Sequence, residues 1–249
     1  MSKVIYEKSK GLTDAVLNYC PGCGHGIIHK LVAESLVELD VLDRTVAISP
    51  VGCSVICYEF FNCDALNAGH GRAPAVATGI KRTNPDSIVF AYQGDGDLAS
   101  IGTAEIVHAA HRGENITVIF VNNAIYGMTG GQMAPTTLPG QKTSTSPLGR
   151  DVGLAGKPIL VSEMLAQIPS TTYIERVSVH DVPHIRKAKK AIKKAFDNQK
   201  QGKGFSLIEV VSPCTVGWKL NGPDAMKFIK SDMLPYYPLG VYKDAPEEA

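Results

Sequence analysis

The sequence predicts an α/β domain in which helices flank a mainly parallel sheet. Short runs rich in valine and isoleucine, typical of strands that are buried on both faces, alternate with longer segments of helical periodicity. The chain has 249 residues, of which 44% are apolar, and a formal net charge of +1. This composition suits one large soluble domain with a buried core, or at most two small domains.

Each expected element follows from such a pattern along the chain. Apolar residues recur at helical spacing over residues 27–37, 102–112 and 182–198. The strand-like runs are residues 45–49, 87–92, 116–122 and 205–211. Because strands and helices alternate, the strands are expected to run parallel, with helices as crossover connections.

Two segments depart from this alternation. Residues 129–158 are dense in Gly, Pro, Thr and Ser, which predicts a long loop that is either disordered or functional, often a lid. After Trp218 there is one expected short helix, at 224–233, followed by Pro235 and Pro238. We therefore expect a domain at 1–218 and a C-terminal tail at 219–249 that packs on the domain or on a partner subunit.

Composition also argues against several classes of function. Near-neutral charge gives no reason to expect nucleic acid or a membrane surface as a partner. No apolar run approaches the ~18 residues that span a bilayer, and the first ten residues do not resemble a signal peptide. We expect a cytoplasmic protein, in which six cysteines are better candidates for a metal site than for disulfides.

The sharpest motif is Gly94-Asp95-Gly96-Asp97, directly after one expected strand, with Asn123 at the end of the next. In a parallel sheet both segments lie at the carboxyl edge, where ligands bind. The glycines allow backbone amides to approach a diphosphate closely. Asp95, Asn123 and a nearby backbone carbonyl could supply three oxygen ligands to Mg²⁺. The alternative is two ordinary turns, since these residue types are common in turns. The diphosphate site is favoured because both segments, the one at 94–97 and the one at Asn123, follow expected strands.

Four of the cysteines could form a second site. Cys20 and Cys23 are separated by two residues and precede a helix, whereas Cys53 and Cys214 each follow an expected strand. Folding could therefore bring all four to the same edge of the sheet. Four thiolates suit an iron–sulfur cluster or a structural zinc ion, and the spacing alone does not choose between them. The remaining two, Cys57 and Cys63, are expected to be small buried residues.

With both sites on one chain, the sequence resembles the β subunits of 2-oxoacid:ferredoxin oxidoreductases. Gly94-Asp95-Gly96 together with Asn122-Asn123, here called the GDG…NN pair, resembles the thiamine-diphosphate fingerprint. The resemblance covers residues 20–214. It is carried by Cys20-Pro-Gly-Cys23-Gly, Val51-Gly-Cys53-Ser54, His70-Gly-Arg72, Gly94-Asp-Gly-Asp97, Asn123-Ala-Ile125-Tyr-Gly127 and Ser212-Pro-Cys214.

The resemblance implies a thiamine-diphosphate-binding fold and a set of site residues. A [4Fe-4S] cluster would be held by Cys20, Cys23, Cys53 and Cys214. Mg²⁺ would be held by Asp95, Asn123 and the carbonyl of Ile125. Cofactor contacts would come from Val51, Gly52, Cys53, Ser54, His70, Gly94, Gly96, Asp97, Gly127 and Met128. The catalytic candidates are His70 and Arg72, which could instead be an exposed loop pair; Arg72 could serve the diphosphate or a substrate carboxylate.

The resemblance also implies a reaction and its partners. A 2-oxoacid would be oxidatively decarboxylated to acyl-CoA and CO₂, with electrons passing through the cluster to ferredoxin. An α subunit would hold the pyrimidine ring of the cofactor, beside γ and ferredoxin-like δ subunits. Substrates of the 2-oxoisovalerate or 2-oxoglutarate class are expected, with pyruvate or an aryl 2-oxoacid as alternatives. Some relatives carry a lysine shortly after the Gly-Cys-Ser turn, where this chain has Val55, Ile56 and Cys57.

Other functions fit the sequence less well. The β half of an acetolactate-synthase-like decarboxylase would lack the four cysteines, and a non-catalytic iron–sulfur or zinc-binding subunit would not need the GDG…NN pair. A Rossmann dehydrogenase would need a G-x-G-x-x-G motif after an early strand. The basic segment 186–194 could dock acidic ferredoxin. An exposed helix face explains it better, because Ile185, Ala188, Ile192 and Phe196 account for its buried side.

Overall fold

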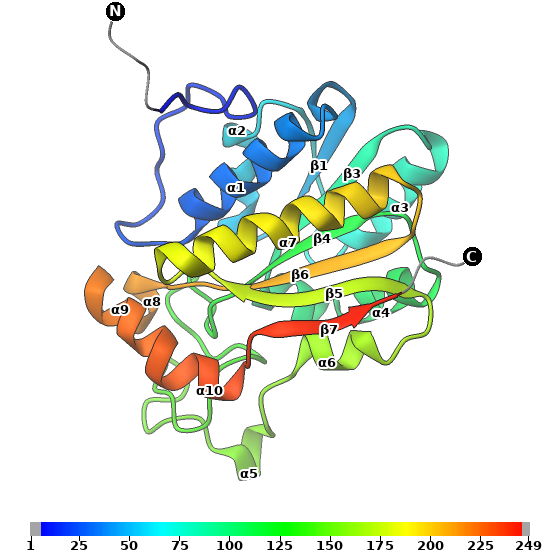
Figure 1. Ribbon diagram of the computed structural model, residues 1–249. Coiled ribbons are helices and arrows are strands. Elements are labelled where there is room, and N and C mark those ends of the chain that lie inside the picture. The colour runs from blue at the N-terminus through cyan, green and yellow to red at the C-terminus, as the bar shows by residue number, and fades with distance from the viewer. Residues whose placement is uncertain (1–5, 246–249) are drawn as a thin grey trace, which may run out of the picture.

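The protein, seen in a computed structural model that describes residues 6–245, is built around one seven-stranded sheet (Figure 1). The strand order is β2-β1-β3-β4-β6-β5-β7; β7 is antiparallel to β5, and the other neighbours are parallel. The strands are β1 (Thr45–Ser49), β2 (Asp64–Asn67), β3 (Ile88–Gly94), β4 (Thr117–Asn122), β5 (Thr171–Ser178), β6 (Phe205–Val211) and β7 (Gly240–Asp244).

Helices cover both faces of this sheet. The longer ones are α1 (His25–Glu38), α3 (Ala73–Thr83), α4 (Thr103–His111), α6 (Val161–Ala166), α7 (Val182–Lys200) and α9 (Gly222–Phe228). Short α-helical turns are α2 (Cys57–Phe60), α5 (Val152–Ala155), α8 (Thr215–Trp218) and α10 (Leu234–Tyr236). The 3₁₀ turns are η1 (Leu42–Arg44) and η2 (Cys53–Ile56), and the π-helical turns are η3 (Asp97–Ile101) and η4 (Ile229–Met233).

The two faces of the sheet are buried in separate layers because successive strand side chains point to opposite sides. In β4, Ile119 and Val121 pack with α1 and α7, which lie side by side across one face (Figure 1). Val118 and Phe120 of the same strand pack with α3, α4 and α6 on the other face. Burial on both sides explains the continuous apolar runs that identified the central strands.

The expected fold class is confirmed. The four expected strands are β1, β3, β4 and β6, with their ends within two residues of the expected positions. β3 continues to Gly94, so the GDGD motif begins inside the strand rather than after it. The edge strands β2 and β7, together with β5, α3 and α6, are additional to the elements read from the sequence.

The long segment at 129–158 is organised by one buried arginine. The Arg150 side chain donates hydrogen bonds to the carbonyl oxygens of Ala134, Pro135 and Thr137 at 2.9–3.1 Å. It also donates to Ala155 and Gly156 at 3.1 and 3.0 Å. These bonds satisfy backbone groups that have no partner in a helix or strand, so the loop has a fixed shape.

The chain after Trp218 folds back onto the same domain. Ile229, Met233 and Tyr237 are fully buried and pack against Leu138 of the long loop. β7 then pairs with β5 and covers that edge of the sheet. Within the described residues, residues 219–245 are thus in contact with the expected 1–218 domain.

Three of the basic side chains of α7 pair with acids of this chain. Lys189 lies 2.7 Å from both Glu34 and Glu38 of α1, and Lys194 lies 2.5 Å from Asp244 of β7. Lys193 also reaches Glu38, at 2.8 Å. These pairs fasten α7 to its neighbours, and ferredoxin docking on this helix stays a prediction.

Among the described residues, no helix is both long and apolar enough to cross a membrane.

The order of the strands locates the ligand-binding edge. The chain leaves β1 for β2 on one side, whereas β3 and β4 follow on the other side. The strand order therefore reverses between β1 and β3. In open parallel sheets, ligands bind at such a reversal, beyond the carboxyl ends of the strands.

Candidate functional site

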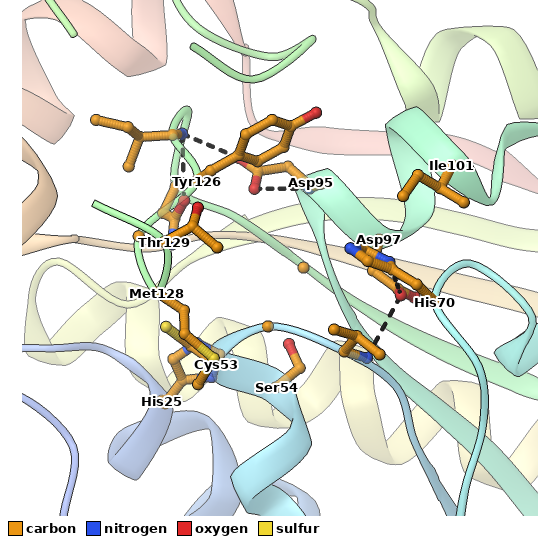
Figure 2. A pocket seen from close by; sticks show the side chains of 17 residues that line it. His25, Cys53, Ser54, His70, Asp95, Asp97, Ile101, Tyr126, Met128 and Thr129 are labelled. Carbon is orange, nitrogen blue, oxygen red and sulfur yellow. Dashed lines mark hydrogen bonds and ion pairs between the residues drawn. The ribbon is translucent and has the colours of Figure 1, made fainter. Parts of the chain in front are cut away.

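A cavity of about 260 Å³ opens at this reversal, beyond the carboxyl ends of β1, β3 and β4. Its lining includes every residue predicted to contact the cofactor or Mg²⁺: Val51, Gly52, Cys53, Ser54, His70, Gly94, Asp95, Gly96, Asp97, Asn123, Ile125, Gly127 and Met128. Figure 2 shows His70 and Asp97 at one side of the cavity, and His25, Cys53 and Met128 at another. The structure brings the predicted residues together, while their binding roles stay predictions.

Three oxygen-bearing groups converge on one wall of the cavity. One terminal atom of the Asn123 amide lies 2.7 Å from the carbonyl oxygen of Ile125 and 3.3 Å from Oδ2 of Asp95. If that atom is nitrogen, it donates to both oxygens. If it is the amide oxygen, it accepts from the N–H of Ile125 at 3.3 Å, but it faces the carbonyl oxygen of Ile125 with no proton between the two. A cation bound there would relieve the repulsion among the three oxygens. Oxygen ligands of these types are those that Mg²⁺ prefers.

A strained turn aims these groups. Ala124 has φ 57°, a left-handed conformation that a non-glycine residue rarely adopts. Its backbone N–H donates to Oδ1 of Asn122 at 3.2 Å, and the Asn122 amide donates to the buried Glu209 of β6 at 2.8 Å. The strain is thus held by buried hydrogen bonds, as is common where a turn must present a carbonyl group to a ligand.

Asp95 is almost fully buried and receives three hydrogen bonds. Oδ1 accepts from the N–H of Gly96 at 3.0 Å, and Oδ2 accepts from the N–H of Ile125 at 3.2 Å and the hydroxyl of Thr136 at 2.7 Å. Burial nevertheless raises the pKa of Asp95 to about 6, with these bonds opposing the shift. A carboxylate in this position gains from a bound cation, which replaces the lost solvation. Thr136, in the long loop, was not found from the sequence.

Asp97 joins three segments around the cavity. Its fully buried carboxylate accepts from Nδ1 of His70 and the N–H of Gly71, both at 2.7 Å, and from the Gln93 side chain at 2.6 Å. Because the carboxylate is the acceptor, the proton lies on Nδ1, and in the neutral form of the ring Nε2 of His70 keeps its lone pair. The His70 ring is 37% exposed and lines the cavity.

Arg72 has a different environment from His70. It is not among the residues that line the cavity, and its guanidinium pairs with Glu105 of α4. The ion pair fixes the start of α3 against α4. A contact between Arg72 and a diphosphate or substrate carboxylate stays a prediction that requires this pair to open.

The four predicted cysteines come together from three segments. A Cβ atom added at Gly127, in the cavity wall, would lie 3.0 Å from Sγ of Cys214 and 3.7 Å from Sγ of Cys53. The segment with Cys20 and Cys23 is fastened to the loop of Cys214 because the Thr215 hydroxyl donates to the carbonyl of Pro21 at 2.9 Å. The cysteine set therefore stands directly behind the cavity. Cys57, by contrast, is buried in the core.

Three thiols of this set, those of Cys23, Cys53 and Cys214, are held in their protonated form. Burial raises the pKa of Cys53 to about 11 and that of Cys214 to about 12, with the neighbouring Cys23 adding to both shifts. Burial also raises the pKa of Cys23, and the N–H groups of His25 and Gly24 oppose the shift. Metal ions bind thiolates, so a bound metal must supply the positive charge that this environment lacks.

An aromatic cluster, missed from the sequence, lies beside the cavity and the cysteine set. His25 is buried, lines the cavity, and has Nδ1 2.7 Å from the hydroxyl of Tyr92. Tyr19 stacks on His25 with ring centroids 4.7 Å apart and donates its hydroxyl proton to the carbonyl of Cys53 at 3.0 Å. The only signal in the sequence is that His25 directly follows the Cys20–Gly24 motif.

The mouth of the cavity is apolar. Val51, Ile101 and Met128 are exposed there. Ile101, Tyr126 and Thr129 are further lining residues that had no predicted role. Among the described residues of the lining, none is lysine or arginine. A ligand entering this mouth meets hydrocarbon side chains rather than a second cation.

Comparison with known proteins agrees with this geometry. Residues 50–210 match the family described as thiamine pyrophosphate enzyme, C-terminal TPP binding domain. The ketoisovalerate oxidoreductase subunit VorA of Methanothermobacter thermautotrophicus is 48% identical over 244 residues, which are 98% of this chain and 51% of that protein. The 2-oxoglutarate synthase subunit KorB of Methanocaldococcus jannaschii is 38% identical over 92% of this chain and 82% of its own length.

A solved structure is similar over nearly the whole chain. It is 2-oxoglutarate:ferredoxin oxidoreductase from Magnetococcus marinus with 2-oxoglutarate, coenzyme A and succinyl-CoA bound. The TM-score is 0.80 and the sequence identity 26%, over 98% of this chain and 87% of the matched chain. The chain spans about half the length of the ketoisovalerate relatives.

Proposed function

The chain belongs to the thiamine-pyrophosphate-binding β subunits of the 2-oxoacid:ferredoxin oxidoreductases. From that premise we propose that it carries the oxidative decarboxylation of a 2-oxoacid to acyl-CoA and CO₂ in the cytoplasm, with electrons leaving to ferredoxin. The observation that carries the proposal is the position of Cys53. It lines the cavity beside the predicted diphosphate site, and its sulfur and that of Cys214 both lie close to Gly127.

The cavity residues divide the work of holding thiamine diphosphate and Mg²⁺. The glycines of the GDGD motif allow backbone N–H groups to reach a diphosphate. Asp95, Asn123 and the carbonyl of Ile125 would hold the cation that bridges to it. When bound, the cofactor supplies the electron sink for loss of CO₂, and the protein supplies orientation and electrostatics.

A [4Fe-4S] cluster fits the cysteine set better than a single zinc ion does. With Zn–S bonds of about 2.3 Å, zinc gathers its four sulfurs tightly around one point. In the described part of the chain, no three cysteine sulfurs lie within 4.8 Å of one another. A cluster of several atoms suits the wider spacing, and it supplies the one-electron acceptor that ferredoxin reduction requires.

His70 is the candidate for proton handling at the cavity. Asp97 accepts the Nδ1 proton, so in the neutral form of the ring Nε2 can accept a proton from a bound ligand and, once protonated, return it. The same carboxylate binds the N–H of Gly71, which ties the ring position to the loop before α3. We assign His70 as the contact to cofactor or substrate, with Asp97 fixing its tautomer.

Of the two leading substrate classes, the lining favours a branched-chain 2-oxoacid such as 2-oxoisovalerate. A 2-oxoglutarate molecule carries a second carboxylate, for which a protein usually supplies Arg or Lys. The described lining has neither, and Val51, Ile101 and Met128 at the mouth suit a branched aliphatic chain. The 48% identity to a ketoisovalerate oxidoreductase subunit supports the same class.

The substrate proposal is tested with the purified complex under anaerobic conditions. Rates of ferredoxin reduction with 2-oxoisovalerate, 2-oxoglutarate, pyruvate and phenylpyruvate are compared at equal coenzyme A. We expect the highest kcat/KM with 2-oxoisovalerate. A higher value with 2-oxoglutarate would contradict the assignment and would imply that a partner subunit supplies the missing cation.

A separate test concerns the partner. The resemblance assigns the glutamate that contacts the cofactor's pyrimidine ring to an α subunit, with γ and ferredoxin-like δ subunits completing the assembly. The chain alone, loaded with cluster and cofactor, should therefore not turn over any 2-oxoacid, and addition of the α subunit should restore acyl-CoA formation. Turnover by the isolated chain at the rate of the complex would show that the active site lies within these 249 residues.

A further inference from the structure

A second group of side chains that could ligate a metal lies between the end of β5 and the first turn of α7. His180, Asp181 and His184 each present one ligand atom, and these atoms lie within 4.8 Å of one another. Nε2 of His180 is 3.3 Å from Oδ2 of Asp181, and Nδ1 of His184 is 2.6 Å from Oδ1. The two imidazole rings are 4.3 Å apart, centroid to centroid. None of these residues lines the cavity described above.

The position of His180 is fixed from behind. Its side chain is only 6% exposed, and Nδ1 lies 2.9 Å from the hydroxyl of Ser178, the last residue of β5. That hydroxyl donates its own proton to the carbonyl of Val211 at 3.1 Å, so it must accept the proton of His180 Nδ1. The Nε2 atom consequently faces Asp181 with a lone pair. Metal-binding histidines are typically oriented by such a hydrogen bond at the other nitrogen.

Asp181 has two roles that can be separated. It is the N-cap of α7, because Oδ1 accepts from the backbone N–H of His184 at 2.9 Å. Its second oxygen, Oδ2, faces His180. A carboxylate between two imidazoles is a ligand set that transition metals bind and that hard cations such as Mg²⁺ do not prefer.

We propose that His180, Asp181 and His184 form a binding site for a divalent transition metal ion of the zinc, cobalt and nickel class. The ion takes the place of the proton between Asp181 and His184 and binds the lone pair that His180 turns toward the same carboxylate. It fastens the first turn of α7 to the end of β5, next to the strand that leads into the loop of Cys214. The charge that disfavours a cation here is Lys230 of η4.

The protonation state of the cluster is compatible with this role. Burial lowers the pKa of His180; Asp181 opposes the shift, and His184 and Lys230 add to it. The ring is therefore neutral near pH 7, which is the form that binds metals.

The test uses the full chain purified anaerobically with its cysteine set loaded, so that the thiols do not compete for the added metal. Co²⁺ is titrated in equilibrium dialysis, and its difference absorption spectrum is recorded. We expect one ion per chain with the weak ligand-field bands of nitrogen and oxygen ligands. Intense charge-transfer bands from sulfur would place the ion at cysteines instead and overturn the proposal.

Four variants separate metal binding from helix capping. Asp181→Asn keeps a good N-cap but loses the charge, and His184→Ala removes one ring; each should weaken Co²⁺ binding by more than about 100-fold. Ser178→Ala leaves all three ligands and should weaken it by about 10- to 100-fold. The control is the double variant His108→Ala, His111→Ala, which removes an exposed histidine pair on α4.

The outcomes distinguish the proposal from its alternatives. Thermal unfolding of Asp181→Asn without metal should match that of the parent chain, whereas the rise in Tm on adding Co²⁺ should be lost. Unchanged Co²⁺ affinity in Asp181→Asn and His184→Ala would show that the cluster is only a helix cap. Loss of binding in the α4 control would place the ion there.

Discussion

The cation-binding wall, formed by Asp95, Asn123 and the carbonyl of Ile125, and the cysteine set both adjoin the cavity, yet the chain builds them differently. The first is organised by the chain itself: Asp95 is buried and receives three hydrogen bonds. In the second, the polar neighbours of the thiols of Cys23 and Cys214 are backbone N–H groups, and Cys20 is exposed. The cation-binding wall is therefore formed before its ligand binds, whereas the cysteine set needs its metal to give the thiols a partner.

The largest effect is expected at the cysteine set. The parent chain, purified anaerobically, should be brown and contain about four irons, as a [4Fe-4S] centre requires. Cys53→Ser should lose most of this iron, because the cluster then lacks a ligand. Iron analysis and the absorption spectrum are the measurements. Cys63→Ser, outside the set, should keep the iron, and a colourless parent chain with one zinc ion would contradict the assignment.

Loss of the cation ligand comes next. Asp95→Ala should weaken Mg²⁺-dependent binding of thiamine diphosphate by more than about 100-fold, because a charged oxygen ligand is removed. Calorimetric titration of the assembled complex measures the affinity. The fold should persist, and Asp43→Ala, at an exposed acid, should bind as the parent does. Equal affinity in Asp95→Ala would mean that the GDGD motif is only a turn.

A smaller effect is expected from a residue that orients Asp95 in the cation-binding wall before Mg²⁺ binds. Thr136→Val removes the hydroxyl that donates to Oδ2 of Asp95 at 2.7 Å while keeping the volume of the side chain. Loss of a bond that orients a ligand should weaken Mg²⁺ binding by about 10- to 100-fold. The same titration measures it, with the exposed Thr83→Val as control. An unaltered Mg²⁺ affinity would mean that Asp95 does not depend on this bond.

The smallest effect is expected at Tyr237, which contacts Thr136 rather than Asp95 itself. Tyr237→Phe removes the hydroxyl that donates to the carbonyl of Thr136 at 2.6 Å. The free energy of unfolding should fall by about 1 kcal/mol, the usual worth of one hydrogen bond, and Mg²⁺ affinity should fall less than in Thr136→Val. Urea unfolding and calorimetry measure the two quantities. Tyr236→Phe, which lacks such a bond among the described contacts, serves as the matched control.

The sequence was informative wherever a residue directly follows a central strand. Gly94 to Asp97 and Asn123 to Met128 could be placed because β3 and β4 are continuous apolar runs whose ends are easy to find. The strand β5 was missed because it contains Glu175 and Arg176, which suggest a surface. Arg176 is in fact fully buried, with Glu163 and Glu209 as charge partners at 2.5 and 2.9 Å.

The supporting residues could not be found in the same way. Thr136 lies 41 residues from Asp95, in a loop without periodicity, and only folding brings the two together. The motif around His70 and Arg72 was visible, yet the sequence did not indicate that Asp97 would bind the first and Glu105 the second. Contacts of this kind depend on packing between segments, which the local pattern of residues does not encode.

The hydrogen bond from Tyr237 to Thr136 also bears on the order of events during synthesis. The hydroxyl of Thr136 donates to Asp95, and the carbonyl of Thr136 accepts from Tyr237, which is synthesised 101 residues later. On the ribosome, the residues of β1 to β4 are synthesised before the segment that completes the wall. The wall therefore gains its last supporting hydrogen bond only after Tyr237 is made, and a protease that removes the C-terminal segment would remove that support without cutting any residue of the cavity.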